Sequence, residues 1–403
     1  MAKDNTEDLL EKYYDDLWAN WYGFAVAKDL RKYNANDNIS FITRMFSPRP
    51  NPTTRHERAR YWLRKNLFGT FWNSLGTIVA TLFILFVVYK FVDLAIIAAV
   101  IGQNGVETCR ASEGYNTAPH ACWIVIKSHL TRFIFGFYPE EHYWRAVAVM
   151  IILPLSLSSL FTKLNFVRSL FLTVIVVFVA RFLVLGGFGL EGVPLVKIGG
   201  ALLPIAYGFP LMYISLSLGF LLFFGLQFAI APIRWMAVGI SAIGKYIPLI
   251  VLMYSSVTLS ILSLSPGVNP DIITRLAPVL ILPTAVTISE TLHKRFGLYP
   301  KALKEQSTSL GLSQWQSITR LQLPHSYLKS RADIFDAFAE LFKNMSLINL
   351  IGLLGPIGFA QIINGDEEWV SVRFEFYFTI AVFYWVFSFT LRCIGEYFRN
   401  KWI

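Results

Sequence analysis

Two glycine-containing stretches have residue types and spacings that could bind a phosphate group. In GISAIGKY, Gly239, Gly244 and Lys245 fall as they do in a P-loop, but Tyr246 replaces the Ser or Thr that binds Mg²⁺. In GGFGLEG, residues 186–192, the glycines match the dinucleotide pattern GxGxxG. Both motifs need a preceding strand in an α/β fold, and an apolar run stands there instead. We therefore expect no nucleotide site in this chain; ATP and Mg²⁺, if used, would be bound by a partner chain.

Histidine and cysteine spacing gives no catalytic or metal-binding set. The six histidines are scattered, and no Cys/His spacing resembles a zinc site, so we expect neither a catalytic residue nor a metal. Cys109 and Cys122 lie in one polar stretch, VETCRASEGYNTAPHACW. In an oxidising compartment they predict a disulfide that closes a small loop; two unpaired thiols are the alternative.

One polar segment, KALKEQSTSLGLSQWQSITRLQLPHS at residues 301–326, stands out among the apolar runs. Pro300 and Gly311 predict the start and end of a short helix. A second short helix is predicted to follow and to end at Pro324. The apolar residues would give the pair one apolar side: Leu303, Leu310, Trp315, Ile318 and Leu321. Such a pair is shaped to dock on a soluble partner, or alternatively to rest on the lipid surface.

The elements around this segment are predicted to cross a membrane. The chain is 55% hydrophobic and 15% charged, whereas soluble domains have about 25% charged residues. Apolar runs of about 20 residues span a bilayer as helices. We therefore predict an all-α integral membrane protein with eight transmembrane helices, near residues 71–91, 144–161, 167–186, 209–231, 245–263, 271–292, 346–363 and 374–394.

Charge placement predicts the orientation of these helices. Basic residues cluster at 55–65, just before the first span, which favours a cytoplasmic N-terminus. Eight spans return the C-terminus to the cytoplasm, and the acidic stretch at 366–368 then faces outward. The net charge of +10 is explained by cytoplasmic loops, so we expect the lipid bilayer as a partner and no nucleic acid.

The polar segment resembles the EAA loop of ABC importer permeases. Glu305 and Gly311 have the spacing of that loop, and Leu323 with Pro324 follows at a similar distance. KNMSLINLIGL, from Lys343, is similar to the KDTSL-type segment of polar amino acid permeases, and KYIPLIVLM to their RGVPL stretch. Departures include Gln306 and Ser307 in place of two alanines.

The N-terminal half resembles the longer, M-type permease of general L-amino acid importers. NLFGTFWNSLGT, the cysteine pair ending in ACW, and FGFYPEEHYWR carry this similarity. The resemblance implies three extra spans before a five-span core. It divides the chain into a cytoplasmic tail (1–66), an extra transmembrane region with a disulfide-containing periplasmic loop (67–205), and a permease core (206–396) with a cytoplasmic coupling loop (293–345).

The resemblance implies a non-enzymatic permease subunit in the bacterial inner membrane. Its partners would be a second permease in a heterodimer, a dimer of ATP-binding subunits that hold ATP and Mg²⁺, and a periplasmic amino acid-binding protein. The implied ATPase-coupling residues are Glu305, Gly311, Leu312, Ser313, Trp315, Gln316 and Pro324.

The substrate path is less well defined by the sequence. Polar residues of the core are candidates for it: Gln227, Ser255, Ser256, Thr258 and Lys343. An ion-coupled secondary transporter of amino acids is the alternative function. That class uses acidic residues at the bilayer midplane and an inverted repeat, and the sequence indicates neither. A membrane scaffold without transport activity would have no reason to keep the Glu–Gly–Leu-Pro spacing.

Overall fold

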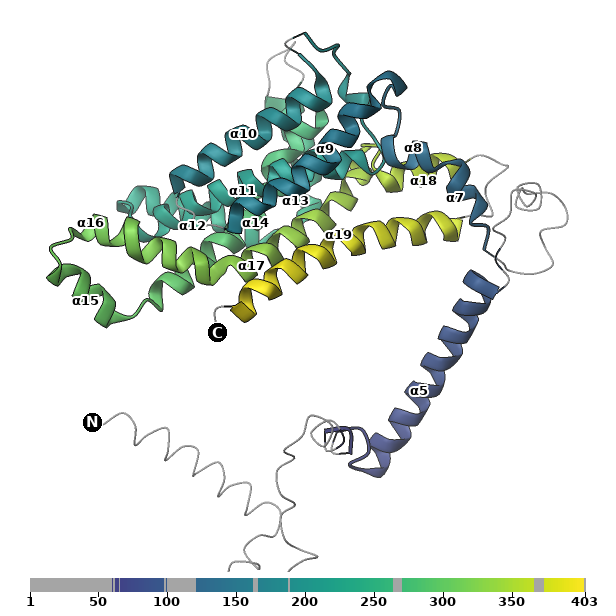
Figure 1. Ribbon diagram of the computed structural model, residues 1–403, viewed down its shortest axis with the longest axis horizontal. Helices are drawn as coiled ribbons and strands as arrows, with labels where there is room; N and C mark the ends of the chain where they lie inside the picture. The colour runs from purple at the N-terminus through teal and green to yellow at the C-terminus, as the bar shows by residue number, and fades with distance from the viewer. Residues whose placement is uncertain are drawn as a thin grey trace, which may run out of the picture. The chain divides into compact units, whose positions relative to one another are not determined.

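The computed structural model describes residues 60, 62–64, 66–97, 99, 121–161, 166–187, 189–263, 270–365 and 373–401 (Figure 1). Within these ranges the regular elements are helices, together with two isolated β-bridges, Gly136–Ile198 and Gly187–Leu190. The prediction of an all-α membrane protein is confirmed. Cys109, the acidic stretch at 366–368 and nearly all of the N-terminal tail lie outside the described residues.

The chain divides into two units, Met1–Lys90 and Phe91–Ile403. In the first unit the described helix is α5 (Phe71–Val92), which begins where the first span was predicted and has no buried residue. Its sequence is apolar on all sides, as expected for a helix that faces lipid. With the π-helical turn at Asp93–Ile97 it is long enough to cross a membrane.

The second unit is built around α11 (Leu202–Phe228), a helix that is buried over most of its length. It packs against α9 (Tyr143–Ser156), α10 (Phe166–Leu185) and α14 (Ile272–Gly297). At Gly219 of α11 an added Cβ would come within 2.7 Å of the Ile288 side chain on α14. Small residues allow such close helix crossings in membranes, so this glycine is required by the packing.

Hydroxyl groups join α9 and α10 to α11. On α10, the Thr173 Oγ1 lies 2.8 Å from Ser217 Oγ and donates to the Tyr213 carbonyl at 2.9 Å. The Tyr213 hydroxyl in turn contacts Ser156 of α9 at 3.2 Å. Interhelical hydrogen bonds of this kind stabilise helix association in apolar surroundings. Residues before and after the predicted boundary at 205/206 thus share one core.

Two spans are broken rather than straight. α12 (Ala231–Tyr246) and α13 (Leu249–Ser263) meet at a bend of 116°, at Ile247–Pro248. The predicted span at 245–263 is therefore α13 alone, and the loop expected before it is helical. GISAIGKY lies inside α12, so it does not form a phosphate-binding loop. Lys245 and Glu290 connect α12 to α14 by an ion pair of 2.6 Å.

The second broken span corrects the predicted placement of the span at 346–363. The helical chain from Gln314 to Ile351 bends by 41° into α18 (Pro356–Asn364). Its main part, α17 (Leu323–Asn344), packs along α19 (Arg373–Lys401) and buries Tyr327, Phe335 and Phe338. Residues 323–344, predicted to belong to the coupling loop, therefore form a core helix. Charged residues elsewhere on α17 lower the mean hydropathy of this segment, so hydropathy alone did not predict a membrane helix there.

Within the described part of the chain, six helices are long and apolar enough to span a membrane, and the number rises to eight if each bent pair counts as one span. The predicted number of eight is reached in this way. The order of the spans agrees with the prediction. The spans predicted at 245–263 and 346–363 each belong to a bent pair that begins earlier in the sequence.

Candidate functional site: a helical projection and a polar pocket

A helical projection, residues Lys301–Gln322, extends from the end of α14 (Figure 1). Its first helix, α15 (Lys301–Ser309), ends at Gly311, which has a φ of +77°. The Leu312 N–H donates to the Ser307 carbonyl at 3.2 Å and the Gly311 N–H to Thr308 at 3.0 Å. These two bonds form a Schellman motif, which needs a left-handed residue at the position of Gly311. The predicted role of Gly311 in ending this helix is confirmed.

The second helix of the projection begins with a capping box. At the start of α16 (Gln314–Ser317), the Gln316 N–H donates to Ser313 Oγ at 3.2 Å, and Ser313 N–H to Gln316 Oε1 at 3.0 Å. Both ends of the connection between α15 and α16 are therefore fixed by local hydrogen bonds. These local hydrogen bonds fix the orientation of α15 relative to α16.

The two helices are also joined through a buried pair of serines. Ser307 of α15 and Ser317 of α16 lie 2.7 Å apart at their Oγ atoms, and both are buried. Gln322 donates to Ser317 Oγ at 3.1 Å. Ser307 is one of the two residues that depart from the alanines of the EAA pattern, and here its hydroxyl makes a contact that an alanine lacks.

The second helix does not end at Pro324, contrary to the prediction. The chain continues from α16 through a π-helical turn (Ile318–Gln322) into α17, and Pro324 lies in the first turn of α17. A proline inside a helix clashes with the carbonyl four residues earlier, here that of Arg320. Arg320 belongs to the π-helical turn, whose wider geometry accommodates this clash. The projection is therefore rigidly continuous with α17.

Apolar side chains of the projection remain exposed. Leu310 is 80% exposed and Trp315 57% exposed, while Ile318 is buried. The Trp315 ring packs near the end of α11, with centroid distances of 6.3 Å to Phe224 and 6.2 Å to Phe228. On the predicted apolar side, Ile318 is buried and Trp315 packs near α11, whereas Leu310, at the tip of the projection, is exposed to solvent. Glu305 is also exposed.

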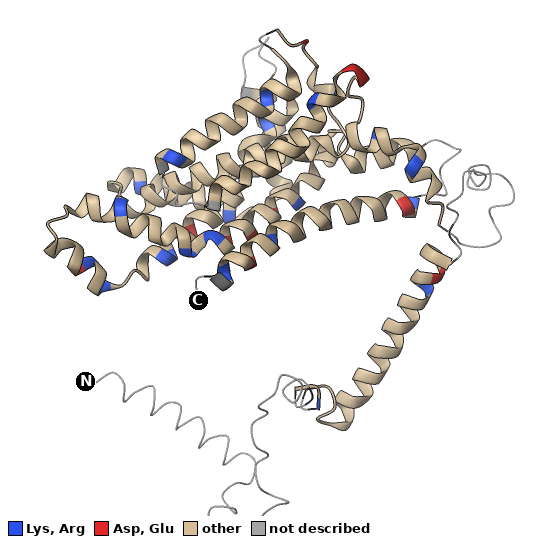
Figure 2. Ribbon diagram, in the orientation of Figure 1, with Lys and Arg blue, Asp and Glu red and all other residues tan. Residues whose placement is uncertain are grey.

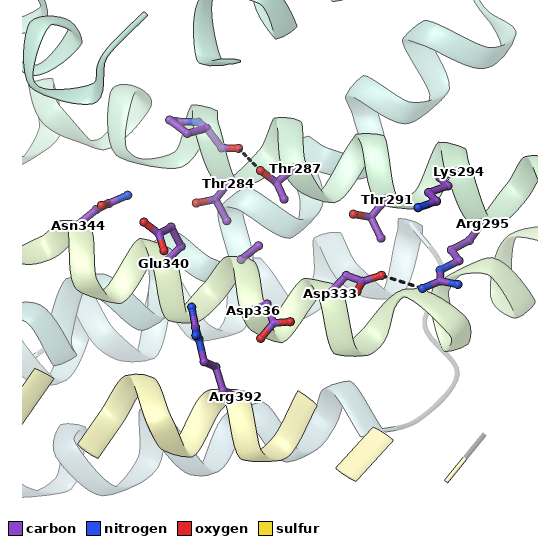
Figure 3. A pocket seen from close by; sticks show the side chains of 12 residues that line it. Thr284, Thr287, Thr291, Lys294, Arg295, Asp333, Asp336, Glu340, Asn344 and Arg392 are labelled. Carbon is purple, nitrogen blue, oxygen red and sulfur yellow. Dashed lines mark hydrogen bonds and ion pairs between the residues drawn. The ribbon is translucent and has the colours of Figure 1, made fainter. Parts of the chain in front are cut away.

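A polar pocket of about 520 Å³ lies between α14, α17 and α19 (Figure 3). Thr284, Thr287 and Thr291 line it from α14, at a helical spacing of three and four residues. Facing residues of α17 and α19 complete it, namely Asp333, Asp336, Glu340, Asn344 and Arg392. Because residues three, four and seven apart share a helix face, the walls from α14 and α17 are each a polar stripe along one helix face.

Charged groups on the pocket walls form ion pairs between helices. Arg295 of α14 contacts Asp333 at 3.1 Å, and Arg399 of α19 contacts Asp336 at 3.2 Å. Figure 2 shows acidic and basic residues close together along α17 and the C-terminal half of α19. Sequence reasoning missed this pocket because α17 was taken as a loop. The signal was present in the helical spacing of the three threonines and of the carboxylates at 333, 336 and 340.

The predicted substrate-path residues are not brought together. Gln227 is exposed at the end of α11, and Ser255 and Thr258 are exposed on α13. Ser256 donates to the Arg275 carbonyl, and Thr258 to that of Tyr254. Lys343 is the member nearest the pocket, since it pairs with the pocket residue Glu340 at 2.5 Å. No member of this set is among the residues that line the described pocket.

The end of the bundle opposite the projection carries the second cysteine. Cys122 is disulfide-bonded and fully buried; the predicted pairing with Cys109 stays a prediction, because Cys109 lies outside the described residues. The Cys122 N–H donates to Glu375 Oε1 at the start of α19. Glu141 and His142, in the 3-10 helix Glu140–His142, and Glu191 could together hold a metal ion, and His142 Nε2 lies 3.3 Å from Glu191 Oε2.

Among the known proteins to which the chain is similar, two are matched over nearly their whole lengths. The chain is 26% identical to the glutamate/glutamine/aspartate/asparagine transport system permease protein BztC of Rhodobacter capsulatus, over 90% of this chain and 98% of that protein. It is also 26% identical to the inner membrane amino-acid ABC transporter permease protein YhdY of Escherichia coli, over 89% and 97% of the two chains.

No family model matches the chain. Among solved structures, a crystal structure of an amino acid ABC transporter with histidines aligns over 49% of this chain and 90% of its own, at 18% identity and a TM-score of 0.45. The relationship therefore rests on the two sequence relatives, which match nearly their whole lengths.

Proposed function

We propose that the chain is the membrane-spanning permease subunit of an ABC importer that moves L-amino acids across the bacterial inner membrane, because it is similar over about 90% of its length to two amino-acid transport permeases. The six to eight candidate membrane spans among the described residues support this proposal. We further propose that both termini are cytoplasmic, which puts the helical projection in the cytoplasm and Cys122 in the periplasm.

The observation that carries the proposal is the helical projection itself. A pair of short helices, fixed by a Schellman motif, a capping box and a buried serine pair, exposes Leu310 and Trp315 at one end of the bundle. Exposed aromatic and apolar residues on a rigid element are typical of a protein interface. In our proposal this element docks on an ATPase subunit, which binds ATP and Mg²⁺.

The link from the projection to the membrane is short on both sides. α14 leads directly into α15, and the π-helical turn joins α16 to α17 without a flexible linker. A movement of the projection would therefore move α14 and α17, the two helices that form facing walls of the pocket. Packed helices have discrete arrangements, so a small shift at the docking site becomes a change between two states of the bundle.

We also propose that the polar pocket belongs to the substrate path. Ionisable residues in membrane spans are costly and usually face a water-filled cavity or a partner, and this pocket gathers several of them. The remaining partners in the proposal are a second permease subunit and a periplasmic amino acid-binding protein.

Uptake of radiolabelled L-amino acids into proteoliposomes that contain the whole complex tests this function. An importer of the ABC class requires ATP inside the compartment that holds the ATPase subunits, and uptake should not respond to dissipation of ion gradients. Uptake that continues without ATP and stops when a proton or sodium gradient is removed would favour the ion-coupled secondary transporter.

A further inference from the structure

Three side chains with metal-ligating groups come together from two segments that are distant in the sequence. Glu141 and His142 lie in the 3-10 helix Glu140–His142, just before α9, and Glu191 lies in the connection between α10 and α11. One ligand atom of each residue, an oxygen of each carboxylate and a nitrogen of the imidazole, lies within 4.8 Å of the other two. None of the three residues lines the polar pocket or belongs to the helical projection.

The two segments are held together by contacts that do not involve these three side chains. The buried Tyr138 hydroxyl donates to the Val184 carbonyl at 2.8 Å, and Nη1 of the buried Arg145 donates to the main-chain carbonyl of Glu191 at 2.7 Å. At Gly186, which has a φ of +82°, an added Cβ would lie 2.3 Å from the Glu191 carbonyl oxygen. The backbone that carries the three ligands is therefore fixed by the fold, as a preorganised metal site requires.

The distance between His142 and Glu191 fits two ligands of one ion. His142 Nε2 lies 3.3 Å from Glu191 Oε2. Nitrogen and oxygen ligands surround Zn²⁺ as a tetrahedron at about 2.0–2.2 Å, which puts two of them about 3.4 Å apart. A direct hydrogen bond between nitrogen and oxygen is most often shorter, about 2.9–3.0 Å. Glu141 is exposed, so rotation of its side chain can bring a third ligand to the same ion.

The charges of the three groups also favour a divalent cation. Two carboxylates this close repel each other, and a shared cation removes the repulsion. Arg145 does not take this role, because it donates to the main-chain carbonyl of Glu191 and forms no ion pair with a carboxylate in the described ranges. The imidazole nitrogen favours a transition metal such as Zn²⁺ over Mg²⁺ and Ca²⁺, which prefer oxygen ligands.

We propose that Glu141, His142 and Glu191 bind a divalent transition-metal ion of the Zn²⁺ class, with water completing the coordination, and that this ion ties the start of α9 to the connection between α10 and α11. The imidazole of His142, whose side chain is 13% exposed, forms the inner side of the site, and the exposed carboxylates close over the ion. The site is structural, so the inference does not depend on which solute the chain transports.

The test measures the Zn²⁺ bound to the complete complex, purified with a tag that contains no histidine, stripped of metal and dialysed against Zn²⁺ in the presence of excess Mg²⁺. We expect the wild-type complex to hold about one more Zn²⁺ per copy of this chain than His142→Gln or Glu191→Gln does. The Zn²⁺ affinity of each variant should fall at least about tenfold, since even changes to residues that orient a ligand cost about 10–100-fold.

Glu140→Gln is the matched control. Glu140 lies in the same 3-10 helix and is exposed, but it does not belong to the three-residue set, so its variant should keep the wild-type Zn²⁺ content. Thermal unfolding gives a second readout, because an ion that binds only the folded chain raises its melting temperature. Zn²⁺ should raise the melting temperature of wild type and Glu140→Gln, and the rise should be lost in the two ligand variants.

A variant that keeps a ligand makes the test decisive even if a glutamine variant fails to assemble. Glu191→His exchanges one zinc ligand for another, so it should retain both the bound Zn²⁺ and the rise in melting temperature. Equal Zn²⁺ contents of wild type and the assembled glutamine variants would overturn the inference. Displacement of the ion by Mg²⁺, or loss of Zn²⁺ from an assembled Glu191→His complex, would overturn it as well.

Discussion

At the scale of single residues, Gly311 determines the shape of the helical projection. Its φ of +77° is a conformation that costs a residue with a side chain about 1–2 kcal/mol, although an added Cβ would meet no atom within 4 Å. The cost of substitution is therefore conformational and not steric. Asn tolerates this backbone region better than β-branched residues do.

From this we predict that Gly311→Val weakens ATP-dependent uptake far more than Gly311→Asn. The two side chains have similar size, so a steric clash with the ATPase subunit would affect both. Uptake and the amount of ATPase subunit recovered with the complex measure the effect. Equal losses in the two variants would show that the left-handed turn is not what matters at this position.

Ser307 provides a second prediction at the residue scale. Removal of its hydroxyl in Ser307→Ala deletes the bond to Ser317, and we expect the free energy of unfolding to fall by about 1 kcal/mol. Ser317 keeps the bond from Gln322, so the loss should stay small. Thermal unfolding of the purified complex measures it, with exposed Thr308→Ala as the control. An unchanged melting temperature would mean that the serine pair does not stabilise the projection.

At the scale of elements, the exposed tip of the projection should act in binding and not in folding. Leu310 is 80% exposed, so Leu310→Asp should leave the thermal stability of this chain unchanged and reduce the ATPase subunit bound to it at least about tenfold. Buried apolar anchors dominate interfaces, and a charge there is penalised. Leu298→Asp is the control, since Leu298 is 67% exposed just before the projection. Equal effects of both changes would point to a general disturbance of the surface.

The contact of α10 with α11 gives the other prediction at this scale. Ser217 of α11 contacts both Ser169 and Thr173 of α10, at 2.9 and 2.8 Å. Ser217→Val removes these bonds, and we expect the free energy of unfolding to fall by about 1–2 kcal/mol because the buried Ser169 hydroxyl loses Ser217 as its partner. Ser217→Thr, which keeps the hydroxyl, serves as the comparison in a thermal unfolding experiment. Similar stability of the two variants would contradict the role of this network.

Sequence patterns predicted some elements well and others poorly, for physical reasons. α5 and α10 are apolar nearly throughout, so a hydropathy argument found them. α17 has apolar residues that pack against α14 and α19 and charged residues that line the pocket. Its average hydropathy is therefore as low as that of a polar loop. The end of α15 was predicted correctly because it depends on one residue, Gly311, that can be recognised in the local sequence. Pro324 was misjudged because the relief of its clash depends on the π-helical turn before it.

At the scale of the whole molecule, the site could be predicted only in part. The projection is a continuous segment, and its spacing of Glu305, Gly311 and Pro324 can be read along the chain. The pocket combines α14, α17 and α19, which are separated by many residues, and its charge balance depends on which groups are paired in space. The residues that the sequence suggested for the substrate path lie on α11, α13 and α17, and none of them lines this pocket.

The most direct test of the account is affinity purification of the tagged chain from membranes in mild detergent, with identification of the proteins that co-elute. The account predicts that an ATP-binding subunit and a second permease are recovered together with the wild-type chain, and that Leu310→Asp loses the ATP-binding subunit while it keeps the second permease. Recovery of the wild-type chain alone, in a form that still moves an amino acid, would contradict the central claim that the projection couples this chain to an ATPase.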